Sequence, residues 1–378
     1  MSDLWWRVPI FMGGVFLVLA TVLAAVRSFV LPRSEAVRIN KWALTLVRYL
    51  FDTVAVFGKT YAQRDRVMAL FAPVGLVMLP LICLGLVSAG YTAIYWALGS
   101  GSLTRCYKLS SSSLLTLGTD ESRSLVVSAF SYSEAALGLL LITLLISYIP
   151  TMYQAFARRE AVVSQLELRA GNNRSAIDLV CWLGRSHSLD DDQKEWDQWA
   201  AWFVELEASH TSLPMLTFFR SPQPGRSWVT AANIILDTAA LILSGVDQTS
   251  NRYTQLCFRA GCMSLNRIMR YFHDHSHTRV SFWRREKNAI VDPDPAAYAA
   301  ALEQLAAQGI PIVVDQDAAW EKYQELRTHY FDAVDYLARL TSSPHLQALY
   351  VEPSVADEKE AQQAIETAAA HDQKISLD

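Results

Sequence analysis

The sequence predicts an all-α membrane protein in which three transmembrane helices precede a soluble helical cytoplasmic domain. Of its 378 residues, 52% are hydrophobic and only 19% are charged, and the mean hydropathy is +0.16. This is more apolar than a typical soluble protein. The excess lies in three runs without a charged residue, at 8–26, 67–98 and 135–157. Each run reaches the roughly 20 residues that a helix needs to cross a hydrocarbon layer about 30 Å thick.

The first run is interpreted as a membrane anchor and not as a cleaved secretory signal. A signal peptide carries a basic segment before its apolar core and small residues at its cleavage site. Residues 1–6 contain no basic residue, and Arg27, Ser28 and Phe29 follow the run. Residues 1–33 are therefore expected to hold the first transmembrane helix.

Charge is distributed unevenly along the chain. Residues 1–158 hold 13 basic and 7 acidic residues, and residues 159–378 hold 20 basic and 30 acidic ones, which together give the net charge of −4. The acidic second half argues against a nucleic-acid partner, because a phosphate backbone recruits basic faces. Basic residues concentrate at 27–66 and 158–169. These segments are predicted to be cytoplasmic, with the N-terminus and residues 99–134 on the outer side of the membrane.

Residues 34–66 have the pattern of an amphipathic helix. Between 39 and 57, apolar residues recur at three- and four-residue steps, and basic residues fall mostly on the opposite side. Two placements remain open for this helix. It would lie along the inner membrane surface beside anionic head groups, or it would pack on the soluble domain.

Residues 161–355 show helical periodicity almost throughout and are expected to form the cytoplasmic domain. Helices are predicted near 173–183, 190–206, 227–243, 254–272, 295–307 and 318–340. Breaks are predicted at the proline-containing stretches 221–225 and 292–295, and the apolar run 310–314 has the composition of a strand. Residues 356–378 are polar and rich in Ala, Glu and Gln, which predicts a flexible tail.

The sequence gives no positive indication of catalysis. Gly58-Lys59-Thr60 resembles the end of a phosphate-binding loop, but Thr53 stands where that loop needs a glycine. The sequence also lacks dinucleotide-binding, HExxH zinc and glycine-flanked serine motifs. We therefore expect neither enzymatic activity nor a cofactor.

A metal site is considered at His273, His275 and His277, because imidazole is a good ligand for zinc or nickel. These residues follow a predicted helix that ends near Phe272, where a protonated histidine suits the carbonyl end of the helix dipole. A surface helix end is the preferred interpretation. The five cysteines lack paired spacing and predict no disulfide framework.

The stretch 110–122, SSSSLLTLGTDES, lies between the second and third apolar runs. Residues 102–115 fit an amphipathic helix of about three turns that ends where Thr116-Leu117-Gly118 begins. Non-helical backbone is tolerated at membrane depth only where protein buries it or where it lines a water-filled cavity. A helix that enters the membrane and ends there would point its carbonyl end at a cation. A re-entrant pore helix and filter loop is the preferred interpretation, and a plain outer loop is the alternative.

Residues 67–160 resemble the pore module of the tetrameric two-transmembrane potassium-channel superfamily, in particular its bacterial members. The resemblance rests on the order of an outer helix, a Ser-rich pore helix, the triplet TLG and the inner helix EAALGLLLITLLISYIPTMYQAFARRE. It implies a homotetrameric channel in the lipid bilayer that conducts K⁺ or Na⁺. A cytoplasmic ligand or protein acting on residues 161–355 would regulate it.

The resemblance also implies which residues form the filter of such a channel. The family filter is Thr-Val-Gly-Tyr-Gly, and its first three positions are matched here. Where the family has Tyr and a second Gly, this chain has Thr119 and Asp120, so a complete potassium filter is not expected. The expected filter is Thr116, Leu117, Gly118, Thr119 and Asp120, with Asp120 and Glu121 as an acidic pore mouth.

The inner helix carries two residues with an implied role in gating. Gly138 lies midway along it, where family members often carry a hinge, and Pro150 lies near its cytoplasmic end. A second interpretation of the whole chain is a membrane-anchored scaffold or sensor that binds a partner through its acidic helical domain. In both interpretations the chain divides into 1–33, 34–66, 67–160, 161–355 and 356–378.

Overall fold

The computed structural model describes residues 4–29, 70–118, 124–170, 175–186, 193–223, 226–247, 252–275, 290–291 and 293–341, with single positions between 343 and 349. The predicted helix at 34–66 and the predicted tail at 356–378 lie outside these residues. So do Thr119, Asp120, Glu121 and His277.

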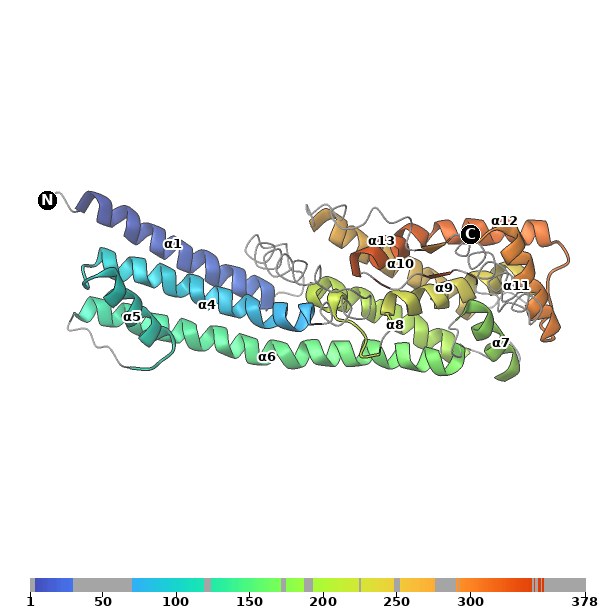
Figure 1. Ribbon diagram of the computed structural model, residues 1–378, viewed down its shortest axis with the longest axis horizontal. Coiled ribbons are helices and arrows are strands. Elements are labelled where there is room, and N and C mark those ends of the chain that lie inside the picture. The colour runs from blue at the N-terminus through green and yellow to red at the C-terminus, as the bar shows by residue number, and fades with distance from the viewer. Residues whose placement is uncertain are drawn as a thin grey trace, which may run out of the picture.

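The described chain is almost entirely helical and elongated (Figure 1). In one half, α1 (Leu4–Phe29), α4 (Phe71–Ala97) and the first part of α6 (Leu125–Ala170) run side by side, and α5 (Leu103–Leu114) contacts α4 and α6. The other half contains α7 (Ala176–Ser186), α8 (Gln193–Ser212), the short 3₁₀ helix η1 (Pro214–Phe218), α9 (Trp228–Gly245), α10 (Arg252–His275), α11 (Pro295–Ala307), α12 (Gln316–Thr328) and α13 (Phe331–Thr341). Two-residue strands β1 (Ile290–Val291) and β2 (Leu346–Gln347) pair in parallel.

Four of these helices are long and apolar enough to cross a membrane. Three of them, α1, α4 and α6, contain the three apolar runs of the sequence. The fourth is α9, whose apolar window is 94% buried inside the protein, against 28% for α1 and 22% for α6. Helix α9 is therefore apolar because it forms the centre of the second half, where it contacts α6, α7, α10, α12 and α13.

Two glycines bring α1 and α4 close together. A β-carbon built on Gly14 would lie 2.7 Å from the carbonyl oxygen of Gly90, and one built on Gly90 would lie 2.6 Å from Val18 Cγ2. Small residues at such crossings allow helix backbones to approach within van der Waals contact. The ring of Trp6, near the start of α1, lies 5.0 Å from that of Trp96, near the end of α4. The two helices are thus antiparallel, and the N-terminal end of α1 lies at the same end of the bundle as α5.

Helix α6 connects the two halves of the molecule. It has 46 residues, which corresponds to a length of about 69 Å at 1.5 Å per residue. It continues through Gly138 and Pro150 and ends at Ala170, ten residues beyond the boundary at 160 that the sequence predicted. Its C-terminal part packs against α7, α8 and α9.

The core of the second half contains a buried polar network. The carboxylate of Asp237 on α9 accepts hydrogen bonds from Arg327 Nη1 at 2.8 Å, from Asn233 Nδ2 at 2.7 Å and from the Tyr330 hydroxyl. Tyr330 lies between α12 and α13, so the single helix predicted at 318–340 is wrong. The chain turns at His329 and Tyr330 instead, and this turn brings the Tyr330 hydroxyl to Asp237.

The apolar run 310–314 is not a strand of a sheet. It lies against the end of α9, where Val313 N donates to Gly245 O at 3.0 Å and Asp247 N donates to Pro311 O at 2.9 Å. One isolated antiparallel bridge joins Val246 and Ile312. The run therefore satisfies the backbone at the C-terminus of α9.

Candidate functional site

Helix α5 lies within the helix predicted at 102–115, and the spacing of its buried residues explains how it packs. Ser102 is its N-cap, and the Ser102 hydroxyl accepts from Arg105 N at 3.4 Å. Most of its buried side chains recur at three- and four-residue steps. These are Cys106, Leu109, Ser110, Ser113 and Leu114, and Ser112 beside them is buried as well. Thr104 and Lys108 are exposed on the opposite side. One face of α5 therefore packs into the angle between α4 and α6.

Glu134 of α6 anchors the buried face of α5. Its side chain is fully buried, and its carboxylate accepts from Ser110 Oγ at 2.5 Å and from the Tyr95 hydroxyl at 2.7 Å. Ser110 Oγ also lies 3.0 Å from the carbonyl oxygen of Ser88 and 2.9 Å from its hydroxyl. Because Ser88 and Tyr95 belong to α4, this network joins three helices at one level.

Two further contacts hold the C-terminal turn of α5 against α6. Ser113 Oγ lies 2.6 Å from Ser131 Oγ. A β-carbon built on Gly138 would lie 2.2 Å from the carbonyl oxygen of Leu114. Only glycine at 138 leaves room for this carbonyl, so the end of α5 touches the backbone of α6 directly.

The end of α5 is closed by Thr116 in a left-handed conformation, with φ of 54°. Thr116 N donates to Ser113 O at 3.0 Å, and Leu117 N donates to Ser112 O at 2.8 Å. This is the bonding pattern of a Schellman motif, in which the left-handed position is usually glycine. A β-branched residue is a clear outlier there. Gly118, with φ of 66°, is left-handed as well.

The predicted filter residues that the structure describes lie on the surface of the single chain. Thr116, Leu117 and Gly118 are exposed, and the side chain of Leu117 is 62% accessible. The predicted hinge residues lie elsewhere: Gly138 packs under the end of α5, and Pro150 lies further along α6, where its side chain is exposed.

The exposed face of α6 carries a line of hydroxyl groups. Thr143, Ser147 and Thr151 each donate to the carbonyl oxygen four residues earlier, at 2.8, 3.0 and 3.1 Å. All three residues are exposed in the single chain. Hydroxyls bonded to their own helix can lie in apolar surroundings without an unpaired donor.

Sequence reasoning missed Glu134. The signal was present, because Glu134 is the one acidic residue between 122 and 159 and is directly followed by the third uncharged run. A single acidic side chain beside a membrane-spanning segment costs free energy unless hydrogen bonds compensate for it. Its partner Ser110 lies in the serine-rich stretch that the sequence did single out.

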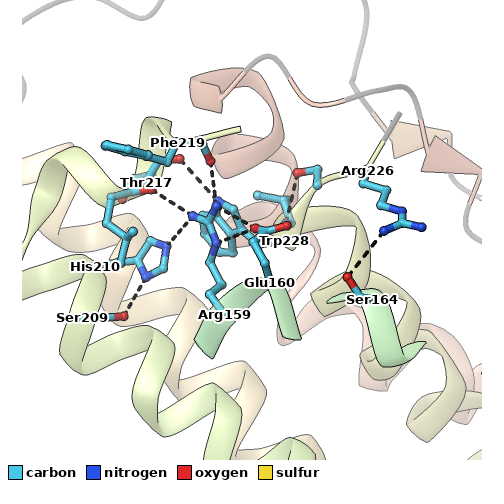
Figure 2. Close-up of polar contacts among 12 residues, drawn as sticks. Arg159, Glu160, Ser164, Ser209, His210, Thr217, Phe219, Arg226 and Trp228 are labelled. Carbon is cyan, nitrogen blue, oxygen red and sulfur yellow. Dashed lines mark hydrogen bonds and ion pairs between the residues drawn. The ribbon is translucent and has the colours of Figure 1, made fainter. Parts of the chain in front are cut away.

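A second site lies where the membrane-length helices meet the other half, and it was also missed. Arg159 of α6 is 2% exposed and lies among α8, η1 and Trp228 (Figure 2). Its guanidinium donates to Leu216 O at 2.9 Å and to Phe219 O at 2.7 Å, and it pairs with Glu160 at 2.8 Å. Arg159 therefore binds the middle residue of η1 and the residue that directly follows this helix.

Helix η1 in turn contacts the helices that are long enough to span a membrane. Met215 and Leu216 pack with Leu76 of α4 and with Met152 and Ala155 of α6. The junction formed by Arg159 and η1 thus links the second half to the N-terminal part of α4 and to the middle of α6.

His210 of α8 completes the junction. Its Nδ1 lies 2.8 Å from Leu206 O and its Nε2 lies 3.5 Å from Arg159 Nη1. Arginine only donates, so Nε2 accepts and Nδ1 carries the proton. Burial first, and the charge of Arg159 second, hold the pKa of His210 well below its usual value, although the Leu206 hydrogen bond opposes them.

The metal site considered at His273, His275 and His277 is not assembled among the described residues, which do not include His277. His273 is exposed near the end of α10, and within the described part of the chain no three histidine, cysteine, aspartate or glutamate side chains are grouped to hold a metal. The five cysteines are buried and free.

Comparison of the chain with protein-family models, with curated proteins and with solved structures finds no match. The fold and the two sites therefore define the protein only as an all-helical chain with several helices compatible with a membrane.

Proposed function

We propose that the protein is a cation channel of the bacterial inner membrane, built from several copies of this chain around one axis. The observation that carries the proposal is the end of α5. This helix is held between α4 and α6 and ends in the exposed segment Thr116–Gly118. The carbonyl end of a helix carries partial negative charge, and backbone carbonyls can replace the hydration shell of K⁺ or Na⁺.

In this proposal α1, α4 and the first part of α6 cross the membrane, and α5 is re-entrant. Exposed apolar side chains near the filter segment support assembly, since Leu115 is 51%, Leu117 is 62% and Leu125 is 87% accessible in the single chain. One pore segment per chain requires a closed ring of copies, and the resemblance to tetrameric channels gives four. The hydroxyls of Thr143, Ser147 and Thr151 would line the path below the filter.

The second half of the molecule would be cytoplasmic and would regulate the pore. Helix α6 passes from the exposed hydroxyl line into the core of that half without a break. A ligand or partner of the second half would act on the pore by favouring one position of α6.

The channel is tested by flux measurements on purified protein in liposomes. We expect flux of K⁺ or Na⁺, and we expect Gly118→Ala to reduce it, because an alanine at φ of 66° strains the filter segment. Gly309→Ala is the matched control. Gly309 is also left-handed, at φ of 81°, and it too has open space around it.

Two results would contradict the channel. One is the absence of flux in the wild type under every gating condition tried, and the other is an equal effect of the two glycine variants. A monomer or dimer in mild detergent without flux would favour the membrane-anchored scaffold instead.

A further inference from the structure

We infer that Glu134 is the positioning residue that fixes the direction of α5 and thereby sets the ion preference of the pore. This inference rests on the proposed function. It concerns a side chain that lies behind α5 and belongs to another helix, and not the filter segment itself.

The first step is the location of the carboxylate. Glu134 is fully buried among three helices, and burial of a carboxyl group is unfavourable unless hydrogen-bond donors surround it. Ser110 supplies one donor to one oxygen and Tyr95 supplies one to the other. A leucine of similar size would fill this space without needing any donor, so packing alone does not account for a glutamate here.

The second step is the geometry relative to the filter segment. Ser110 lies within the last turns of the 12-residue helix α5, six residues before Thr116. The short bond to Glu134 therefore fixes both the depth and the rotation of the turns that carry the terminal carbonyls. The Ser113–Ser131 contact and the Gly138–Leu114 contact fix the next turn but supply no acidic side chain.

The third step is a control contact: a second hydrogen bond between α4 and α6 that does not hold α5. The Tyr91 hydroxyl lies 2.8 Å from Ser133 Oγ. This hydrogen bond joins α4 to α6 beside Glu134 and involves no residue of α5. Removing it weakens the same two helices and leaves the α5 anchor intact.

The experiment compares four variants of the full-length protein, Glu134→Leu, Glu134→Gln, Ser110→Ala and Tyr91→Phe. The first readout is hydrogen exchange of the α5 amides. We expect about tenfold faster exchange in Glu134→Leu and Ser110→Ala, because each loses the buried hydrogen bond between Ser110 and the Glu134 carboxyl group. Tyr91→Phe should match the wild type. Glu134→Gln should restore protection, because a hydroxyl can turn to accept from the amide.

The second readout is the reversal potential with K⁺ on one side and Na⁺ on the other. We expect a shift in Glu134→Leu and Ser110→Ala and none in Tyr91→Phe. An unshifted potential in a conducting Glu134→Leu channel would overturn the inference even if exchange rises, because Glu134 would then be merely structural. Equal α5 exchange in Glu134→Leu and Tyr91→Phe would overturn it too. If the wild type carries no current, the proposed function fails, and exchange decides separately whether Glu134 holds α5.

Discussion

Gly138 of α6 lies directly under the carbonyl oxygen of Leu114, the last residue of α5, so that a β-carbon at 138 would come within 2.2 Å of that oxygen. We predict that Gly138→Ala displaces the end of α5 and speeds exchange of its amides. Gly85→Ala on α4 is the control, because a β-carbon there meets nothing within 4 Å. The alternative role of Gly138 as a gating hinge predicts changed channel opening with α5 still protected, and unchanged exchange in Gly138→Ala would favour it.

Thr116 is a β-branched residue at φ of 54°, where side chains are strained. We predict that Thr116→Gly stabilises the folded protein by about 1 kcal/mol, because glycine reaches this conformation without the penalty. The midpoint of thermal unfolding in detergent should rise. Thr116→Val keeps the branching and should leave the midpoint close to that of the wild type. A lower midpoint for Thr116→Gly would show that the threonine hydroxyl makes a contact that outweighs the strain.

Arg159 and its neighbour Arg158 provide a matched pair of basic residues. Arg159 is buried and donates to Glu160 and to two carbonyl oxygens, one in the middle of η1 and one just after it. The side chain of Arg158, in contrast, is 63% exposed and pairs with Glu205. Removing one partner of a buried ion pair typically costs about 3–5 kcal/mol, and an exposed pair contributes about 1 kcal/mol or less. We predict that Arg159→Ala lowers the free energy of unfolding far more than Arg158→Ala, as measured by chemical denaturation in detergent. Equal losses would contradict the role of Arg159 at the junction.

His210 predicts a pH dependence of stability. Its folded-state pKa lies well below the unfolded value, which is about 6.5. Below that pH the unfolded chain binds a proton that the folded chain does not, so stability falls as the pH drops. The slope from this one group is at most about 1.4 kcal/mol per pH unit and vanishes above neutrality.

The measurement is the difference in unfolding free energy between pH 7.5 and pH 5.5. It should be smaller in His210→Gln than in the wild type, because glutamine does not titrate. His273→Gln is the control, since the side chain of His273 is 76% exposed. An unchanged difference in His210→Gln would show that His210 does not set the acid sensitivity.

Much of the helical architecture can be predicted from local signals in the sequence. Uncharged length identified α1, α4 and the first part of α6. The amphipathic pattern of residues 102–115 identified α5 within one residue at each end. Helix α11 begins and ends at the predicted positions 295 and 307. These features depend on neighbouring residues, which is why a single sequence carries them.

Long-range contacts could not be predicted in the same way. The turn at Tyr330 depends on Asp237, which is 93 positions away along the chain, and no glycine or proline marks it. Glu134 and Ser110 are 24 positions apart, and Arg159 meets η1 across 57 to 60 positions. Each pairing follows from how the helices pack, and periodicity within one helix contains no information about its neighbour. The filter prediction at Thr116, Leu117 and Gly118 and the hinge prediction at Gly138 and Pro150 stay predictions.

Because α6 is one continuous helix, a small tilt at one point displaces distant residues of the same helix much further. Gly138 and Arg159 are separated by 21 residues of one helix, or about 32 Å. A tilt of only about 5° about Arg159 would therefore move the backbone at Gly138 sideways by about 3 Å, roughly the length of the hydrogen bonds that hold α5. A tilt too small to disturb the packing of the second half would thus displace the helix at Gly138 by about the diameter of an ion.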